Sequence, residues 1–168
     1  MDDFFKDENY EIPVTSNYMK LGEGDNTFRV LSSAITGYEY FTDKNKPVRS
    51  KEPFDTMPED IKKDGTIKHF WAFVVYNYGA KRIQVLELTQ KGIMKAMQAY
   101  IKNKAWGNPK LYDINVNRTG AGMDTEYTIT TNPPTPIDVN IAHKYENMYV
   151  NLESLYENQD PFVKEKTK

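Results

Sequence analysis

The densest run of hydrophobic side chains spans residues 69–90 and is interrupted only by the polar segment 77–81. β-Branched and aromatic residues fill both halves, and Gly79 supplies the freedom that a chain reversal needs. The pattern predicts two long antiparallel strands of one hairpin. Large side chains stand at both odd and even positions, so the hairpin either lies between two layers or presents an aromatic face to a flat ligand.

The rest of the chain alternates between strand-like and helix-like spacing. Residues 27–42 alternate hydrophobic and polar side chains around Ser32, Ser33 and Gly37, which predicts one long strand with a bend. The other predicted elements are a long loop, a helix, a second hairpin and a C-terminal amphipathic helix, at residues 43–66, 91–105, 112–131 and 138–158.

This order of elements predicts a mainly β fold. It matches a five-stranded OB-fold barrel with a helix between strands 3 and 4, followed here by a C-terminal helical extension. We expect a flexible arm at residues 1–16, the OB-fold domain at 17–134, the amphipathic helix at 135–158 and a tail at 159–168. The apolar stripe of that helix is expected to pack on its own barrel or, alternatively, on a neighbouring copy in a homodimer.

Composition narrows the kinds of site that the chain can hold. There are no cysteines and only two histidines, far apart in the sequence, so disulfides are excluded and neither a metal nor another cofactor is expected. No window is apolar enough to span a bilayer, and the acidic N-terminus does not resemble a signal peptide, so a soluble cytoplasmic protein is expected. The formal net charge is −2.

Charge is distributed unevenly along the chain. Residues 1–26 carry 2 basic and 7 acidic side chains (net −5), whereas residues 68–134 carry 9 basic and 4 acidic side chains (net +5). A basic centre between acidic ends can form a positive groove, because local potential matters more than the sum of charges.

Catalytic patterns are scarce, and we do not expect an enzyme. One alternative is a metal-dependent nuclease in which Asp113, Asp124 and Glu126 meet near the second hairpin and hold magnesium. Carboxylates beside tight turns are more commonly turn residues, and a histidine at a strand start, such as His69, is more commonly structural.

Single-stranded nucleic acid requires basic groups along a groove and aromatic faces on which bases stack, and the chain places both in the same elements. About half of the aromatic side chains must nevertheless fill the core. The residues expected to contact a strand are Arg29, Tyr38, Tyr40, Phe41, Lys44, Lys46, Arg49, Lys51, Lys68, Trp71, Phe73, Tyr76, Tyr78, Lys81, Arg82, Arg118 and Tyr127.

Whole segments of the chain resemble the single-stranded-DNA-binding proteins of tailed bacteriophages. The segments that carry the resemblance are NYMKL, NTFRVL, GYEYF, KPVR, HFWAFVV, ELTQK, WGNP, YDI and TEY, which begin at residues 17, 26, 37, 46, 69, 87, 106, 112 and 125. They cover nearly all of residues 17–162 in the same order and with similar spacing.

The resemblance implies an OB-fold protein, encoded by a phage or prophage, that coats single-stranded DNA in the cytoplasm of a bacterial host. It implies a role in DNA replication, recombination or repair, with proteins of those processes as partners.

Bacterial single-strand-binding proteins end in an acidic Pro-Phe tip, whereas here Phe162 is followed by the mixed-charge residues 163–168. The alternative is a protein-interaction module in which the helix at 138–158 docks a phage or host protein.

Overall fold

The computed structural model describes residues 4, 6 and 16–164, so most of the predicted arm and the last four residues of the tail lie outside it. In this part of the chain, seven strands form one sheet: β1 (Gly24–Val30), β2 (Ile35–Phe41), β3 (Pro47–Ser50), β4 (Lys68–Asn77), β5 (Arg82–Leu88), β6 (Asp113–Thr119) and β7 (Glu126–Thr131). The helices are α1 (Lys91–Lys102) and α2 (Val139–Glu146), with three short 3₁₀ helices: η1 (Pro109–Leu111), η2 (Gly122–Asp124) and η3 (Leu152–Glu157).

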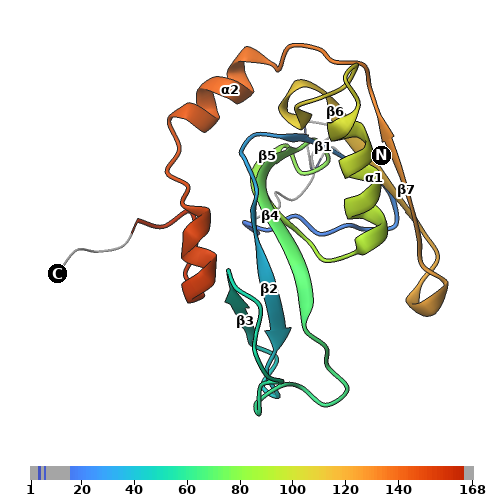
Figure 1. The fold of residues 1–168 in the computed structure, drawn as a ribbon. Helices are drawn as coiled ribbons and strands as arrows, with labels where there is room; N and C mark the ends of the chain where they lie inside the picture. The colour runs from blue at the N-terminus through green and yellow to red at the C-terminus, as the bar shows by residue number, and fades with distance from the viewer. Residues whose placement is uncertain (1–3, 5, 7–15, 165–168) are drawn as a thin grey trace.

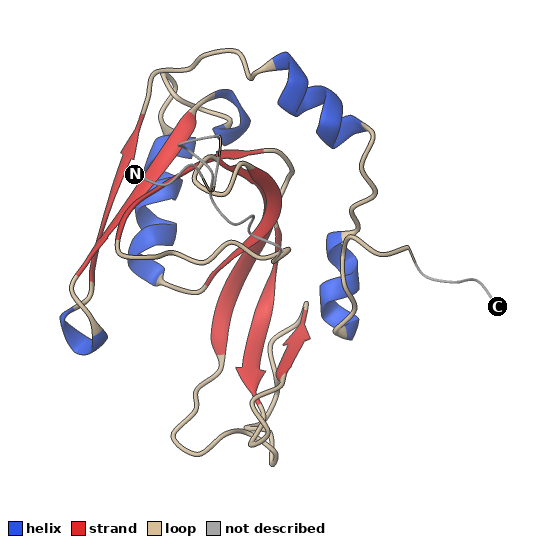
Figure 2. Ribbon diagram, turned by 180° about the vertical axis from the view of Figure 1, so that it is seen from behind, coloured by secondary structure: helices blue, strands red, loops and turns tan. Residues whose placement is uncertain are grey.

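The sheet is antiparallel, mainly β in character as predicted, and open. Its strands follow the order β3-β2-β4-β1-β6-β7, and β5 pairs with β4 off this path. A closed barrel would require β5 to pair with β7, and no such pairing exists between the described strands. The free edge of β5 instead meets residues 17–19, where Met19 N–H donates to Val85 O over 2.8 Å. The sheet curves strongly without closing into the predicted barrel (Figure 2).

The predicted bent strand is present as β1 and β2, which both pair with the same edge of β4. At the bend, the Ser32 hydroxyl accepts the Val74 N–H over 2.8 Å, where a regular strand would offer a backbone carbonyl. Further along, a Cβ on Gly37 would lie 2.3 Å from the Ser50 carbonyl oxygen. Glycine at this position therefore allows β3 to pack against β2.

The central hairpin runs from β4 into β5 as predicted, but its turn uses a different residue from the one expected. Asn77 pairs with Arg82, and the Asn77 side-chain oxygen accepts the backbone N–H groups of Gly79 and Ala80. The left-handed conformation falls on Lys81, with φ 53°, and not on Gly79. The asparagine side chain organises this turn, as short polar side chains commonly do.

Two layers cover most of the two faces of the hairpin, in agreement with the first of the two alternatives drawn from its sequence (Figure 1). On one face, Phe73 and Val75 pack with Ile93, Met94 and Met97 of α1, in a core that also includes Phe28, Leu86, Tyr112, Ile114 and Val116. On the other face, Phe70, Ala72 and Val74 pack beneath the C-terminal segment 137–162.

That C-terminal segment contains two short helices, whereas the sequence predicts one. Helix α2 stops where the Asn147 side chain donates to the His143 carbonyl over 2.9 Å, and Asn151 begins η3 by accepting the Glu153 N–H. The apolar stripe packs on the chain's own sheet, with Leu155 only 1% exposed. The segment also meets residues that precede β1, since the Asn17 amide donates to Asp160 Oδ2 over 3.3 Å.

One further strand distinguishes the fold from the predicted one. Strand β3 lies within the segment predicted to be a loop, and it opens on Pro47 at the edge of the sheet, where a missing N–H costs no ladder bond. Neither helix in the described residues is both long and apolar enough to cross a membrane.

The first prediction tests whether the C-terminal segment belongs to the core. Leu155→Ala should lower the free energy of unfolding by about 2–5 kcal/mol, because it leaves a cavity between η3 and the sheet. Urea denaturation followed by circular dichroism measures this change. Met123→Ala, at a fully exposed hairpin tip, is the matched control and should change stability by less than about 0.5 kcal/mol. Equal effects of the two substitutions would mean that the segment does not contribute to the folded core.

Candidate functional site

The structure divides the seventeen predicted contact residues among the interior, two faces of the sheet and the loops. Three of them, Arg29, Tyr40 and Phe73, are buried, with 2%, 6% and 2% of their surface exposed. Phe73 belongs to the core under α1, and Tyr40 packs edge-on against Phe54 and donates to Asp60. None of the three has a surface on which a strand could lie.

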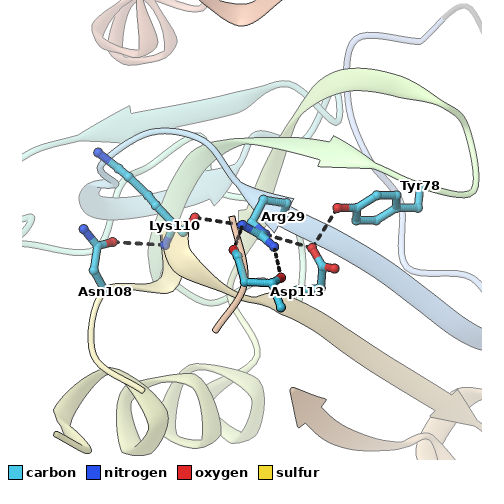
Figure 3. Close-up of polar contacts among 6 residues, drawn as sticks. Arg29, Tyr78, Asn108, Lys110 and Asp113 are labelled. Atoms are coloured by element: carbon cyan, nitrogen blue, oxygen red, sulfur yellow. Dashed lines mark hydrogen bonds and ion pairs between the residues drawn. The ribbon is translucent and has the colours of Figure 1, made fainter. Parts of the chain in front are cut away.

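Arg29 is the centre of a buried polar cluster (Figure 3). Its Nε donates to Asp113 Oδ1 over 2.8 Å, and its Nη1 donates to the carbonyls of Lys110 and Thr135 over 3.2 and 3.1 Å. The Tyr78 hydroxyl donates to the same carboxylate over 2.7 Å; burial and this bond raise the pKa of Tyr78 to about 12. Arg29 and Tyr78 therefore tie β1 and β6 to the loops on either side.

Arg49 lies in a second polar cluster on the face covered by the C-terminal segment. Its Nε and Nη2 both donate to Glu87 Oε2, over 3.1 and 2.8 Å, and its Nε lies 3.3 Å from Glu39 Oε2. Glu39 is 4% exposed. Burial and, to a lesser extent, the Glu87 carboxylate raise the pKa of Glu39 to about 8, against the opposing effect of Arg49. Because the Nε and Nη2 hydrogen bonds of Arg49 go to Glu87, they do not stabilise a negative charge on Glu39. Glu39 therefore remains protonated at neutral pH.

Most of the other predicted residues are dispersed. Tyr76 packs under the C-terminal segment, Tyr127 packs against the core, and Arg118 donates to the Leu21 carbonyl. Lys51 pairs with Glu153 over 2.9 Å and lies over the Tyr156 ring. The remaining predicted residues lie at turns or on the face opposite Tyr38: Phe41, Lys44, Lys46, Lys68, Lys81 and Arg82.

A compact group of rings remains on the sheet face that α1 covers only in part. Tyr38 pairs with His69 and Thr36 pairs with Trp71, so these side chains share the face of Phe73. The Tyr38 and His69 rings lie 5.2 Å apart, and all three rings retain exposed surface. We call Tyr38, His69 and Trp71 the aromatic strip. Two of its members were predicted contacts, and His69 was read as structural.

Beyond Trp71 the strip opens into a cavity of about 290 Å³. Its lining is mainly apolar and includes Phe73, together with Met97 and Ile101 of α1. Asn108 and Lys110 lie at its rim, and Figure 3 shows the Lys110 side chain extending away from Arg29. The cavity therefore joins the aromatic strip to the C-terminal end of α1.

Five lysines that were not among the predicted contacts lie on α1 and in the residues that follow it. Residues 88–112 contain no Asp or Glu, and their lysines at 91, 95, 102, 104 and 110 form no ion pair with a described residue. Lys91, Lys95 and Lys102 occupy the outer face of α1. We call the five lysines the basic stripe. The absence of acidic residues across this span was visible in the sequence and could have identified it.

The carboxylates of the alternative nuclease site are not brought together. Asp113 begins β6 and is bound to Arg29, whereas Asp124 and Glu126 lie at the far end of the same hairpin, where Glu126 pairs with Thr119. No group of three or more His, Asp or Glu side chains among the described residues is arranged to hold a metal ion.

The second prediction concerns Glu39. Its pKa is about 8 in the folded chain, against an ordinary value of 4.5, so the folded state holds a proton that the unfolded state releases between these values. Stability from this group is therefore complete below pH 4.5 and declines as the pH rises through 8. Glu39→Gln should remove that decline. Its gain over the wild type at pH 9 should be about 1.4 kcal/mol for each unit of pKa difference, and should be much smaller at pH 5.

Urea denaturation at both pH values measures the effect on Glu39→Gln. Glu126→Gln, an exposed carboxylate on β7, serves as the control and should follow the wild type at both. Parallel pH profiles for wild type and Glu39→Gln would show that Glu39 is ionised in the folded protein, contrary to the assignment.

Comparisons with models of protein families, with curated proteins and with solved structures found no match to this chain. The resemblance to phage single-stranded-DNA-binding proteins stays a prediction. The candidate interface is defined by its own geometry: the aromatic strip, the cavity at its end and the basic stripe beyond.

Proposed function

We propose that this chain binds single-stranded nucleic acid, DNA in particular, along the aromatic strip and the basic stripe, with little sequence preference and without covalent chemistry. The observation that carries the proposal is the meeting of exposed rings with a lysine-rich span that contains no acidic residue. Bases stack on the rings, and phosphates pair with the ammonium groups.

The binding energies expected from base stacking and phosphate contacts are large enough for micromolar affinity. Stacking contributes roughly 1–3 kcal/mol for each base on an aromatic ring, so two or three rings can supply several kcal/mol. Micromolar binding corresponds to about 8 kcal/mol, and the phosphate contacts of the lysines add the rest. Every base has a flat face, and this mode of binding therefore tolerates any sequence.

We also propose that the sheet is a variant of the OB fold. The bent strand β1–β2 pairs with both β4 and β6, and α1 connects β5 to β6, which supports that relationship. On this proposal the chain acts in the DNA replication, recombination or repair of a phage, as the resemblance of its segments implies. The C-terminal segment covers one face of the sheet and leaves the aromatic strip on the other.

The third prediction tests the rings. Tyr38→Ala and Trp71→Leu should each weaken binding to a labelled oligo-dT by about tenfold, because each removes a stacking surface. Fluorescence anisotropy measures the Kd, and circular dichroism confirms that each variant is folded. Tyr149→Ala removes an exposed ring from the C-terminal segment and should leave the Kd unchanged. The proposed interface is refuted if all three variants bind like the wild type.

The fourth prediction tests the lysines through salt. Lys95→Gln combined with Lys102→Gln should weaken oligo-dT binding and reduce the slope of log K against log salt concentration by about 1.4, since each phosphate contact on a single strand contributes about 0.7. The control combines Lys144→Gln with Lys164→Gln, which removes the same charge from the C-terminal segment. Identical slopes in the two double variants would place the phosphate contacts elsewhere.

A further inference from the structure

The 290 Å³ cavity at the end of the aromatic strip differs in lining from the larger hollows on the described surface. Two hollows of about 690 and 730 Å³ lie between β3 and the C-terminal segment. Arg49 lines both of them, with Glu153 in the first and Asp160 in the second. The 290 Å³ cavity is lined mainly by apolar side chains, and Ile101 among them keeps 37% of its surface exposed. A flat apolar group would remove that surface from water.

The walls of this cavity are held in place before any ligand arrives. The Lys110 N–H donates to Asn108 Oδ1 over 3.0 Å, and Arg29 Nη1 donates to the Lys110 carbonyl over 3.2 Å. Ser32 also lines the cavity, and its hydroxyl is fixed by accepting the Val74 N–H. A ligand that enters does not have to order these segments, so little of its binding energy is lost.

Two polar groups at the rim remain available to a ligand. The Asn108 amide nitrogen donates no hydrogen bond to a described residue, because only its oxygen caps η1. The Lys110 ammonium forms no ion pair with a described residue. An amide donor beside an apolar slot suits the carbonyl or ring nitrogen of a base, and an ammonium beside it suits a phosphate.

We infer that this cavity accepts one unstacked nucleobase of the bound strand, with its ring against Trp71 and Ile101, its polar edge at Asn108 and the adjoining phosphate at Lys110. The inference rests on the proposed function and deepens it. A strand would run along the aromatic strip, turn one base into the cavity and continue over the basic stripe. The inserted base fixes the register of the strand on the protein.

The first measurement uses a single nucleotide, so that the cavity is tested apart from the strand. Thymidine 5′-monophosphate is added to the ¹⁵N-labelled protein, and the two indole N–H signals, from Trp71 and Trp106, are followed by NMR. Trp106→Phe identifies which signal belongs to Trp71. The Trp71 signal should move, and the Trp106 signal should stay in place, since Trp106 packs between Tyr100 and Tyr112.

The second measurement blocks the cavity. Ala34→Phe places a ring at its mouth and should abolish the nucleotide-induced shift and weaken oligo-dT binding by about tenfold, the value of one stacked base. Ala121→Phe makes the same substitution at the exposed hairpin tip and should bind like the wild type. Asn108→Asp keeps the oxygen that caps η1 but replaces the amide donor with a negative charge, and it should weaken both kinds of binding even if Ala34→Phe folds poorly.

The outcomes separate this inference from the proposed function. If oligo-dT binds the wild type, Ala34→Phe and Asn108→Asp equally and the Trp71 signal does not move, the cavity does not hold a base, although strand binding stands. If the nucleotide moves Trp71 and the oligonucleotide does not bind, the cavity is a nucleotide site and the strand-coating function fails. If neither probe binds, both are overturned.

Discussion

The fold depends on a hairpin that buries large apolar side chains on both of its faces. One layer cannot satisfy such a hairpin, because each uncovered face would leave side chains such as Phe70 or Phe73 in water at a cost of roughly 1.5–3 kcal/mol each. Helix α1 covers the first face and the C-terminal segment covers the second. Both covers are therefore structural necessities, and the sheet between them can remain open without exposing its interior.

This constraint also determines where a ligand can lie. On the side of the C-terminal segment, Arg49 is engaged in an ion pair with Glu87 beside the protonated Glu39, and the hydrophobic surface is covered. On the side of α1, the helix is shorter than the sheet, and β2 and β4 extend past it (Figure 1). The rings of the aromatic strip occupy that extension, next to lysines that no acidic neighbour in residues 88–112 neutralises.

Local patterns in the sequence were sufficient to predict the strands and helices that depend mainly on neighbouring residues. The two hairpins and α1 follow from alternation, turn residues and helical spacing, and all three are present. Strand β3 was missed because its four residues open on a proline inside a polar segment. The break between α2 and η3 was missed because the apolar spacing continues across it, while the two asparagine caps that cause it are a weaker signal.

The candidate site was harder to predict, because a charge or ring does not show its partner in the sequence. Arg29 looked like a surface cation, yet its partner Asp113 lies 84 positions away on β6. The two-faced pattern of β4 predicted that one set of rings would be buried but could not say which. Trp71 and Phe73 share a face, and only the length of α1 separates the partly exposed ring from the buried one.

The meeting of Asn17 with Asp160 has a consequence for biosynthesis. Since residues 152–162 close the second face of the central hairpin, a ribosome must release these residues before that face can be shielded. Until then the nascent protein exposes a hydrophobic face of its sheet, which favours assistance by chaperones. The docking of residues 152–162 also joins segments that are remote in the sequence, and such long-range contacts slow folding. Shielding of this face is therefore a late step in folding, completed when residues 152–162 dock on the hairpin.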